Sequence, residues 1–193
     1  MGNCSDKYEV LSSVIQSLES KDTFQNIVKV ILRKANTYIQ AEYIAVVQKE
    51  SDDNRLAYIA SEGEADGFIE KVSDGGYSLE ELNKSVHAHI GVPVGDYVVP
   101  IVINGIKAMY LVIHGTVKEL TEELDSFIHS IASVIQNIAQ MRVTNNSLLS
   151  SYEVLKDILN NIGSGIIVCD RSSANILFEN KVAGESKEIQ NAI

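Results

Sequence analysis

The sequence predicts an α+β protein, in which an antiparallel sheet with helices packed on one face is followed by a long C-terminal coiled-coil helix and a short β-hairpin tail. Three observations predict this fold class. Apolar side chains recur at helical period between Phe24 and Ile39. Two apolar runs are joined by Asn104-Gly105, the strongest short signal for a β-hairpin. A seven-residue repeat of apolar side chains then runs from Thr121 to Ile162.

The composition limits the classes of function. The chain has 193 residues, 45% of them hydrophobic, and a net charge of −10. This acidic balance argues against a nucleic-acid partner, because the phosphates would be repelled. No run of 18 apolar residues is present, so no membrane segment is predicted. The two cysteines, Cys4 and Cys169, are far apart in a chain that begins with the polar stretch Met1–Asp6, and this pattern indicates a cytoplasmic protein.

Two helices are predicted before the sheet. Residues 1–20 are expected to form an N-terminal dimerisation helix. Its apolar side chains follow the 3-4-3 spacing of a helix that packs beside another helix: Tyr8, Leu11, Ile15 and Leu18. The second helix is predicted to be capped by Asp22, with Gln25 three residues later as in a capping box. Its apolar face is expected in the core.

The sheet is predicted from two pairs of β-rich runs. The first pair is Glu42–Val47 and Arg55–Ala60, and the second is Tyr97–Ile103 and Ile106–Ile113. A type I′ turn at Asn104-Gly105 would place Ile103 opposite Ile106. It would also place Ile101 opposite Ala108 and Val99 opposite Tyr110. Both faces of this hairpin are apolar, so we expect it to be a central pair of strands covered on both sides.

The segment Ser61–Asp96 between the two strand pairs is predicted to be an irregular lid with one helix, Leu79–His89. A long segment over one face of a sheet often encloses a small-molecule cavity. The candidate ligand-binding residues are Phe68, Tyr77, Leu82, Val86, His89 and Tyr110. The alternative is a closed core that the lid merely covers. No cofactor, catalytic residue or metal site is predicted, since His87 and His89 would point to different sides of a helix.

The long helix is expected to have two halves. Up to Arg142 a second apolar stripe runs beside the heptad seam, which predicts cover from the chain's own domain and from a partner helix. Beyond Arg142 the seam alone stays apolar, as in a two-stranded coil. The predicted interface of a parallel homodimer consists of Leu11, Ile15, Leu18, Phe127, Ile131, Val134, Ile138, Met141, Asn145, Leu148, Tyr152 and Leu155.

Asn145 lies at an a position in the middle of this seam. An asparagine buried there lowers the stability of the coil but penalises other registers and higher oligomers, because its amide pairs with its twin only in register. The alternative is that Asn145 marks a break between two shorter helices.

The order of the elements resembles a GAF domain over about residues 7–142. The family has a Val-Pro-aliphatic strand, a Gly-bearing turn and a return strand, then Thr and two acidic residues at the start of the last helix. These places are held by Val99-Pro100-Ile101, Asn104-Gly105, Met109-Tyr110-Leu111 and Thr121-Glu122-Glu123. Ala108-Met109 stands where many members have Gly-aliphatic. The resemblance implies a sensory domain over residues 21–142 that binds a small ligand or a partner.

Two activities of GAF proteins are not implied by the resemblance. The Asn-Lys-Phe-Asp-type signature of members that bind cyclic nucleotides is not found. Members that reduce free methionine sulfoxide use cysteines in the lid, and Ser61–Asp96 contains none. We therefore expect these residues not to be an enzyme.

After the coiled-coil linker, residues 143–162, the segment 163–193 is similar to the opening of a PAS domain. The similarity lies in Gly163-x-Gly165, the strands Ile166–Asp170 and Asn175–Glu179, and then Asn180 and Ala183. Two strands cannot complete a PAS sheet, so we expect an incomplete start of such a domain in a longer bacterial sensor protein. The Gly-rich join resembles those of GGDEF proteins, which favours a diguanylate cyclase over a histidine kinase as the output domain.

Two functions are consistent with these patterns. The first is a signal-transduction module that senses a small ligand or partner and relays its state through a dimeric coiled coil. The second is a ligand-free dimerisation scaffold whose GAF core is filled by its own side chains. An empty or a filled cavity under the lid distinguishes them.

Overall fold

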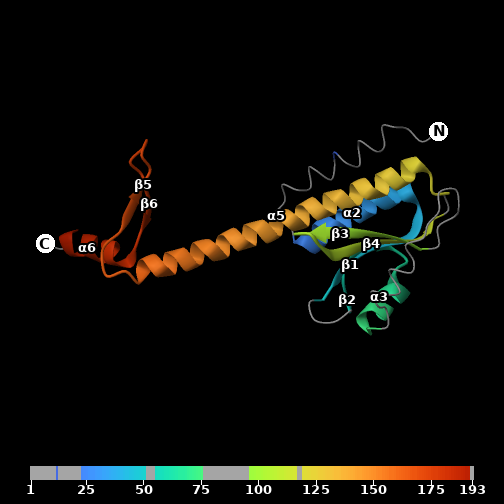
Figure 1. Ribbon diagram of the computed structural model, residues 1–193, viewed down its shortest axis with the longest axis horizontal. Coiled ribbons are helices and arrows are strands. Elements are labelled where there is room, and N and C mark those ends of the chain that lie inside the picture. The colour runs from blue at the N-terminus through green and yellow to red at the C-terminus, as the bar shows by residue number, and fades with distance from the viewer. Residues whose placement is uncertain (1–11, 13–22, 51–54, 76–95, 117–118, 192–193) are drawn as a thin grey trace. The chain divides into compact units, whose positions relative to one another are not determined.

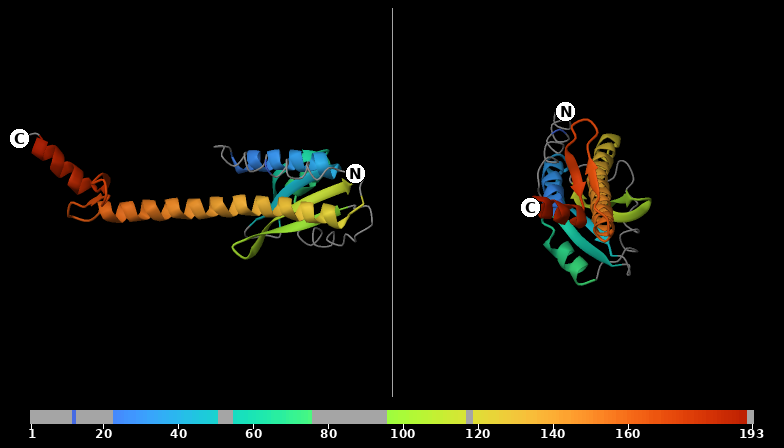
Figure 2. Two further views of the ribbon diagram at one scale, coloured as in Figure 1. Left: turned by 90° about the horizontal axis from the view of Figure 1, so that it is seen from above. Right: turned by 90° about the vertical axis from the view of Figure 1, so that its left-hand side faces the viewer.

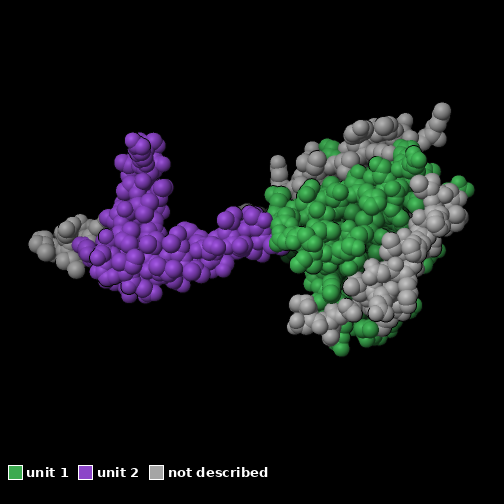
Figure 3. Space-filling view, viewed as in Figure 1, with its two compact units in different colours: residues 1–141 green, residues 142–193 purple. Residues whose placement is uncertain are grey.

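The computed structural model describes residues 12, 23–50, 55–75, 96–116 and 119–191, and it divides into two compact units (Figures 1 and 3). Unit 1 is residues 1–141 and unit 2 is residues 142–193. The predicted helix over residues 1–20, apart from residue 12, and the predicted helix Leu79–His89 lie outside the described residues. Among those that are described, no helix is long and apolar enough to cross a lipid bilayer.

Unit 1 contains a four-stranded antiparallel sheet in the order β2-β1-β4-β3. The strands are β1 (Ala41–Lys49), β2 (Leu56–Gly63), β3 (Asp96–Ile103) and β4 (Ile106–Thr116). β4 is central as predicted, but β3 lies at the edge of the described sheet, so the expected central pair is only half correct. An edge strand suits Pro100, because proline has no N–H to donate to a ladder.

The β3–β4 turn forms as predicted, but the register beyond it does not. Asn104 and Gly105 have φ angles of 51° and 80°, and Ile103 lies opposite Ile106. A bulge between Ile101 and Val102 then places Ile101 opposite Met109, not Ala108, and Val99 opposite Leu111, not Tyr110. The inserted residue on β4 accounts for the one-residue shift.

α2 (Phe24–Ile39) is capped by a side chain at its start and by a backbone N–H at its end. Thr23 is its N-cap and accepts a hydrogen bond from the Asn26 N–H, so the predicted cap at Asp22 is wrong by one residue. At the other end Gln40 adopts a φ of 59° and donates to the Asn36 carbonyl. The Asn36 side chain bonds both the N–H and the carbonyl of Ala41, which directs the chain from α2 into β1.

The main core lies between one face of the sheet and a layer made of α2 and the first part of α5 (Glu122–Asn160), as Figure 2 shows. Tyr38 of α2 and Phe127 of α5 pack with their ring centroids 4.6 Å apart. Thr121 caps α5 as predicted, accepting a hydrogen bond of 3.1 Å from the Leu124 N–H. The predicted α+β class, an antiparallel sheet with packed helices and a long C-terminal helix, is confirmed.

α3 (Asp66–Ser73) lies on the opposite face of the sheet, inside the segment that was expected to be irregular. Gly67 lowers the helix propensity of this stretch. Phe68 and Val72, one helical turn apart, are both buried against the sheet. Their burial outweighs the cost of the glycine.

Unit 2 contains the rest of α5, a hairpin and a short helix. The hairpin strands, β5 (Ile167–Cys169) and β6 (Ile176–Glu179), lie within the two predicted runs. α6 (Lys181–Asn191) was not predicted. Four apolar side chains of the hairpin are exposed by 44–65%: Ile167, Val168, Ile176 and Leu177.

Candidate functional site

The sheet face that carries α3 has its own apolar cluster, separate from the main core. The alternation of side chains along β1 separates this cluster from the main core. Ile44 and Val46 point into the main core, and Ala45 and Val47 point to the opposite face of the sheet. We call this group the second-face cluster; it consists of Ala45, Val47, Leu56, Phe68, Val72, Val98, Tyr110 and Val112, with Tyr43 packed against it.

Two of the six predicted ligand-binding residues meet in the second-face cluster. Phe68 comes from α3 and Tyr110 from β4, and both are buried. Tyr77, Leu82, Val86 and His89 lie outside the described residues, so their part of the prediction stays a prediction. Burial raises the pKa of the Tyr110 hydroxyl above its ordinary value of 10.0. The hydroxyl is a polar group within an otherwise aliphatic and aromatic surface.

A stack of three rings lies at one end of this face. The Tyr43 ring stacks on Phe68 at 5.3 Å and on His114 at 4.9 Å between centroids. The β1–β4 register produces the second contact, because Tyr43 is directly opposite His114. His114 Nε2 lies 3.7 Å from Glu42 Oε2. Tyr43 is not among the predicted site residues, and only the period-two alternation of β1 assigns it to this face.

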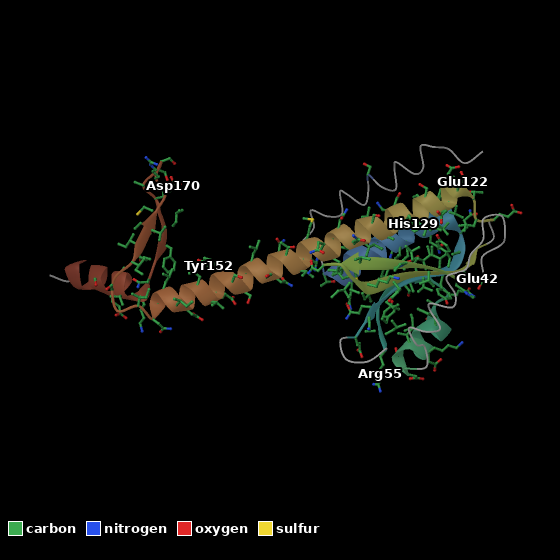
Figure 4. All side chains as sticks on the ribbon, viewed as in Figure 1. Glu42, Arg55, Glu122, His129, Tyr152 and Asp170 are labelled. Atoms are coloured by element: carbon green, nitrogen blue, oxygen red, sulfur yellow. The ribbon has the colours of Figure 1, made fainter. Side chains whose placement is uncertain are left out.

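A pocket of about 550 Å³ opens beside the same cluster, where β1, β2 and the end of α3 meet. Its lining includes Leu56 and Val72, which both belong to the second-face cluster. Charged residues of both signs line it as well, namely Glu50, Arg55 and Asp74. Figure 4 places Arg55 and Glu42 at different ends of the sheet, so the pocket and the ring stack lie at the two ends of this face. The accessible lining of this pocket is mostly polar, whereas small-molecule sites are usually lined mainly by apolar side chains.

A polar contact ties the edge strand β3 to α5. The Tyr97 hydroxyl donates a hydrogen bond to the Asp125 carboxylate and lies 3.3 Å from His129 Nε2. Burial, and then the bond to Asp125, raise the pKa of the Tyr97 hydroxyl well above its ordinary value of 10.0. We interpret this contact as structural. No group of three or more His, Cys, Asp or Glu side chains able to hold a metal occurs among the described residues.

This contact predicts a pH dependence of stability. Because the folded state favours the neutral Tyr97 phenol, its contribution is complete below pH 10 and is lost as the pH rises further. We expect the wild-type protein to lose more unfolding free energy than Tyr97→Phe between about pH 9 and about pH 11. Urea titrations of both proteins measure this difference. Equal losses would show that Tyr97 titrates normally.

The predicted dimer residues on α5 fall into two groups. Phe127, Ile131 and Ile138 are at most 5% exposed and pack in the chain's own main core, where the prediction had placed them between two subunits. Val134 is half-buried at the edge of that core. From Met141 onward the predicted seam is exposed. Its apolar side chains there are 53–63% exposed: Met141, Leu148, Tyr152 and Leu155.

Asn145 is also exposed within this stripe, and α5 passes through it without a break, so the alternative of two shorter helices is wrong. Leu149 and Ile158, at e and g positions of the heptad, are exposed as well and flank the seam. Neither residue is in the predicted interface. Figure 4 labels Tyr152 on this part of α5.

The fold of the chain is similar to solved GAF structures. The TM-score is 0.52 with the GAF domain of a phosphoenolpyruvate-protein phosphotransferase from Coxiella burnetii, at 16% identity over 75% of this chain and 99% of that one. It is 0.54 with the phycoerythrobilin-bound GAF domain of a cyanobacterial phytochrome, at 9% identity over 75% and 100%. It is 0.50 with a free methionine-R-sulfoxide reductase from Neisseria meningitidis, at 10% identity over 74% and 96%.

No protein-family model and no curated protein matches the sequence. At these identities the structural likenesses show the fold, and the chain has a GAF-like fold.

Proposed function

We propose that the chain is a sensory GAF module that relays its state through a parallel dimeric coiled coil. The observation that carries this proposal is the change in burial along α5. The helix is buried in the subunit core up to Ala139, and from Met141 its apolar seam is exposed. An exposed apolar heptad stripe on a helix is the surface that a second copy of the same helix covers.

Dimerisation through the seam can be tested with one charge at two positions. Leu148→Asp puts a carboxylate into the seam, and we expect it to weaken dimerisation by roughly 100-fold or more, because two like charges would be buried together. Val143→Asp places the same charge at an outer f position, and we expect no change. Sedimentation velocity over a range of concentrations measures both.

Either of two results would contradict the dimeric relay. One is a wild-type chain that stays monomeric at the highest concentration reached. The other is a Leu148→Asp variant that dimerises as tightly as the Val143→Asp control, which would move the interface away from the seam.

The second-face cluster and its pocket are the proposed sensory site. The pocket volume is within the roughly 300–1,000 Å³ of small-molecule sites. A ligand in this pocket would contact the charged side chains of Glu50, Arg55 and Asp74 together with the apolar side chains of Leu56 and Val72. Native mass spectrometry of the purified protein tests this: a mass above that of the denatured chain supports a bound ligand. Identical masses favour the ligand-free scaffold.

The proposed module is not an enzyme, and its partners are a second copy and an output domain in a cytoplasmic bacterial signalling protein. The residues from Ser5 to Val168 contain no cysteine, so unit 1 offers no thiol chemistry between these positions. The resemblance of the tail to the start of a PAS domain, and of its join to GGDEF proteins, supports a diguanylate cyclase over a histidine kinase as the output.

A further inference from the structure

Asn180, between β6 and α6, is 1% exposed and is the only buried polar residue among the described side chains. A buried amide is costly unless its donors and acceptor are all bonded. Here every one is used. The Oδ1 atom accepts from the backbone N–H groups of Ile166 (2.8 Å) and Ala183 (3.1 Å). The Nδ2 atom donates to the carbonyls of Leu159 and Ser164, both at 2.9 Å.

These bonds join the C-terminal turn of α5 to the N-terminal turn of α6. The Leu159 carbonyl is one of the last four of α5, which lack partners inside the helix, and the Ala183 N–H is one of the first four of α6. A second side chain acts in the opposite direction, since Asn160 of α5 accepts a hydrogen bond of 3.0 Å from the Lys181 N–H. Each helix end therefore caps the other.

Polar bonds, and not an apolar core, hold this joint. Among the described residues of unit 2, Ala183 is the one buried apolar residue; four apolar side chains of the hairpin are exposed and Phe178 is half-buried. A Cβ on Gly165 would come within 3.3 Å of the Ala183 Cα, so the linker passes close to α6. Loss of the amide bonds has little packing to compensate for it.

We infer that this reciprocal cap makes the order of α6 and of the β5–β6 hairpin conditional on the last turn of α5. Only the signalling role of the joint rests on the proposed relay. In that role, a state of the coiled coil that unfolds the last turn of α5 would remove the cap of α6. Only an amide can make all four bonds at once, because they need two N–H donors and an oxygen that accepts twice.

Hydrogen exchange on the whole 193-residue chain tests the joint. Asn180→Asp has the same shape and keeps the acceptor for Ile166 and Ala183, but it sets an oxygen against the carbonyls of Leu159 and Ser164. We expect exchange in peptides covering 159–166 and 181–191 to accelerate at least tenfold, because the two carbonyls lose the amide donor and face a carboxylate oxygen in its place. Asn146→Asp, an exposed position on α5, is the matched control and should change neither peptide.

A second variant tests the direction of the dependence. Asp157→Pro disrupts the last turn of α5 and leaves Asn180 intact, and it should also release peptide 181–191. The inference is overturned if α6 stays protected in either Asn180→Asp or Asp157→Pro, or if it is unprotected in the wild type. Sedimentation of the same samples reports dimerisation separately, so a failed relay and a failed joint give different results.

Discussion

Replacing Ile131 by alanine is expected to lower the free energy of unfolding of unit 1 by about 3 kcal/mol, whereas Leu155→Ala should change it by less than about 0.5 kcal/mol. The heptad pattern assigns both residues to one seam. The structure separates them, since Ile131 is 0% exposed in the main core and Leu155 is 53% exposed. The truncation at Ile131 leaves a cavity among packed side chains, and the one at Leu155 removes atoms that are in water.

Urea titrations followed by far-UV circular dichroism measure these differences. Both substitutions should be made in the Leu148→Asp background, so that self-association does not contribute to the comparison. A small effect at Ile131 together with a large one at Leu155 would contradict the burial pattern. It would also support the sequence-based prediction that Ile131 lies in the dimer interface.

The sequence could not distinguish these two environments, for a physical reason. Spacings of three and four residues put side chains on one side of a helix, whether that side faces a partner helix or the chain's own sheet. Up to Ala139 the a and d positions and the second stripe together form the arc that covers the main core. The sequence showed that this arc is wide, but not which side of it a partner could reach.

Features with local determinants were predicted well. The Asn104-Gly105 turn and the Thr121 cap depend on residues within a few positions of each other. The bulge that inserts a residue into β4 depends on how β3 and β4 pair, and no residue near it in the sequence predicts it.

The candidate site was predicted in the same uneven way. Phe68 and Tyr110 were selected as large side chains near the lid, and the fold does bring them into one cluster. Tyr43 was missed because its side is set by strand alternation. Asn180 was identified only as part of a resemblance, because its partners are backbone atoms up to 21 residues away that no sequence pattern specifies.

Gly63→Ala is expected to be the most damaging single change beside the second-face cluster. Gly63 has a φ of +92°, and a Cβ there would lie 2.1 Å from the Glu42 carbonyl oxygen. That oxygen already accepts a hydrogen bond of 3.0 Å from the Glu64 N–H, so moving it away would break a bond between β1 and the chain that follows β2. We expect a loss of about 4 kcal/mol or more.

Gly105→Ala is the matched control, because it separates the steric clash from the backbone strain. Gly105 has a similar φ of +80° but nothing within 4 Å of its would-be Cβ. Its substitution should cost only the left-handed conformation, roughly 1–2 kcal/mol. Urea titrations of both variants give the difference. Equal losses of unfolding free energy in the two variants would mean that the Glu42 carbonyl moves away from the new Cβ at no cost.

The consequence of Gly63→Ala should reach the candidate ligand site. Gly63 lies opposite Tyr43, the middle ring of the Phe68–Tyr43–His114 stack. Pushing β2 away from β1 at this point displaces the ring on which the other two stack. We therefore expect near-UV circular dichroism from tyrosine to weaken in Gly63→Ala under conditions where the chain is still folded, and to be retained in Gly105→Ala. A retained signal in both would show that the stack does not depend on this approach of the two strands.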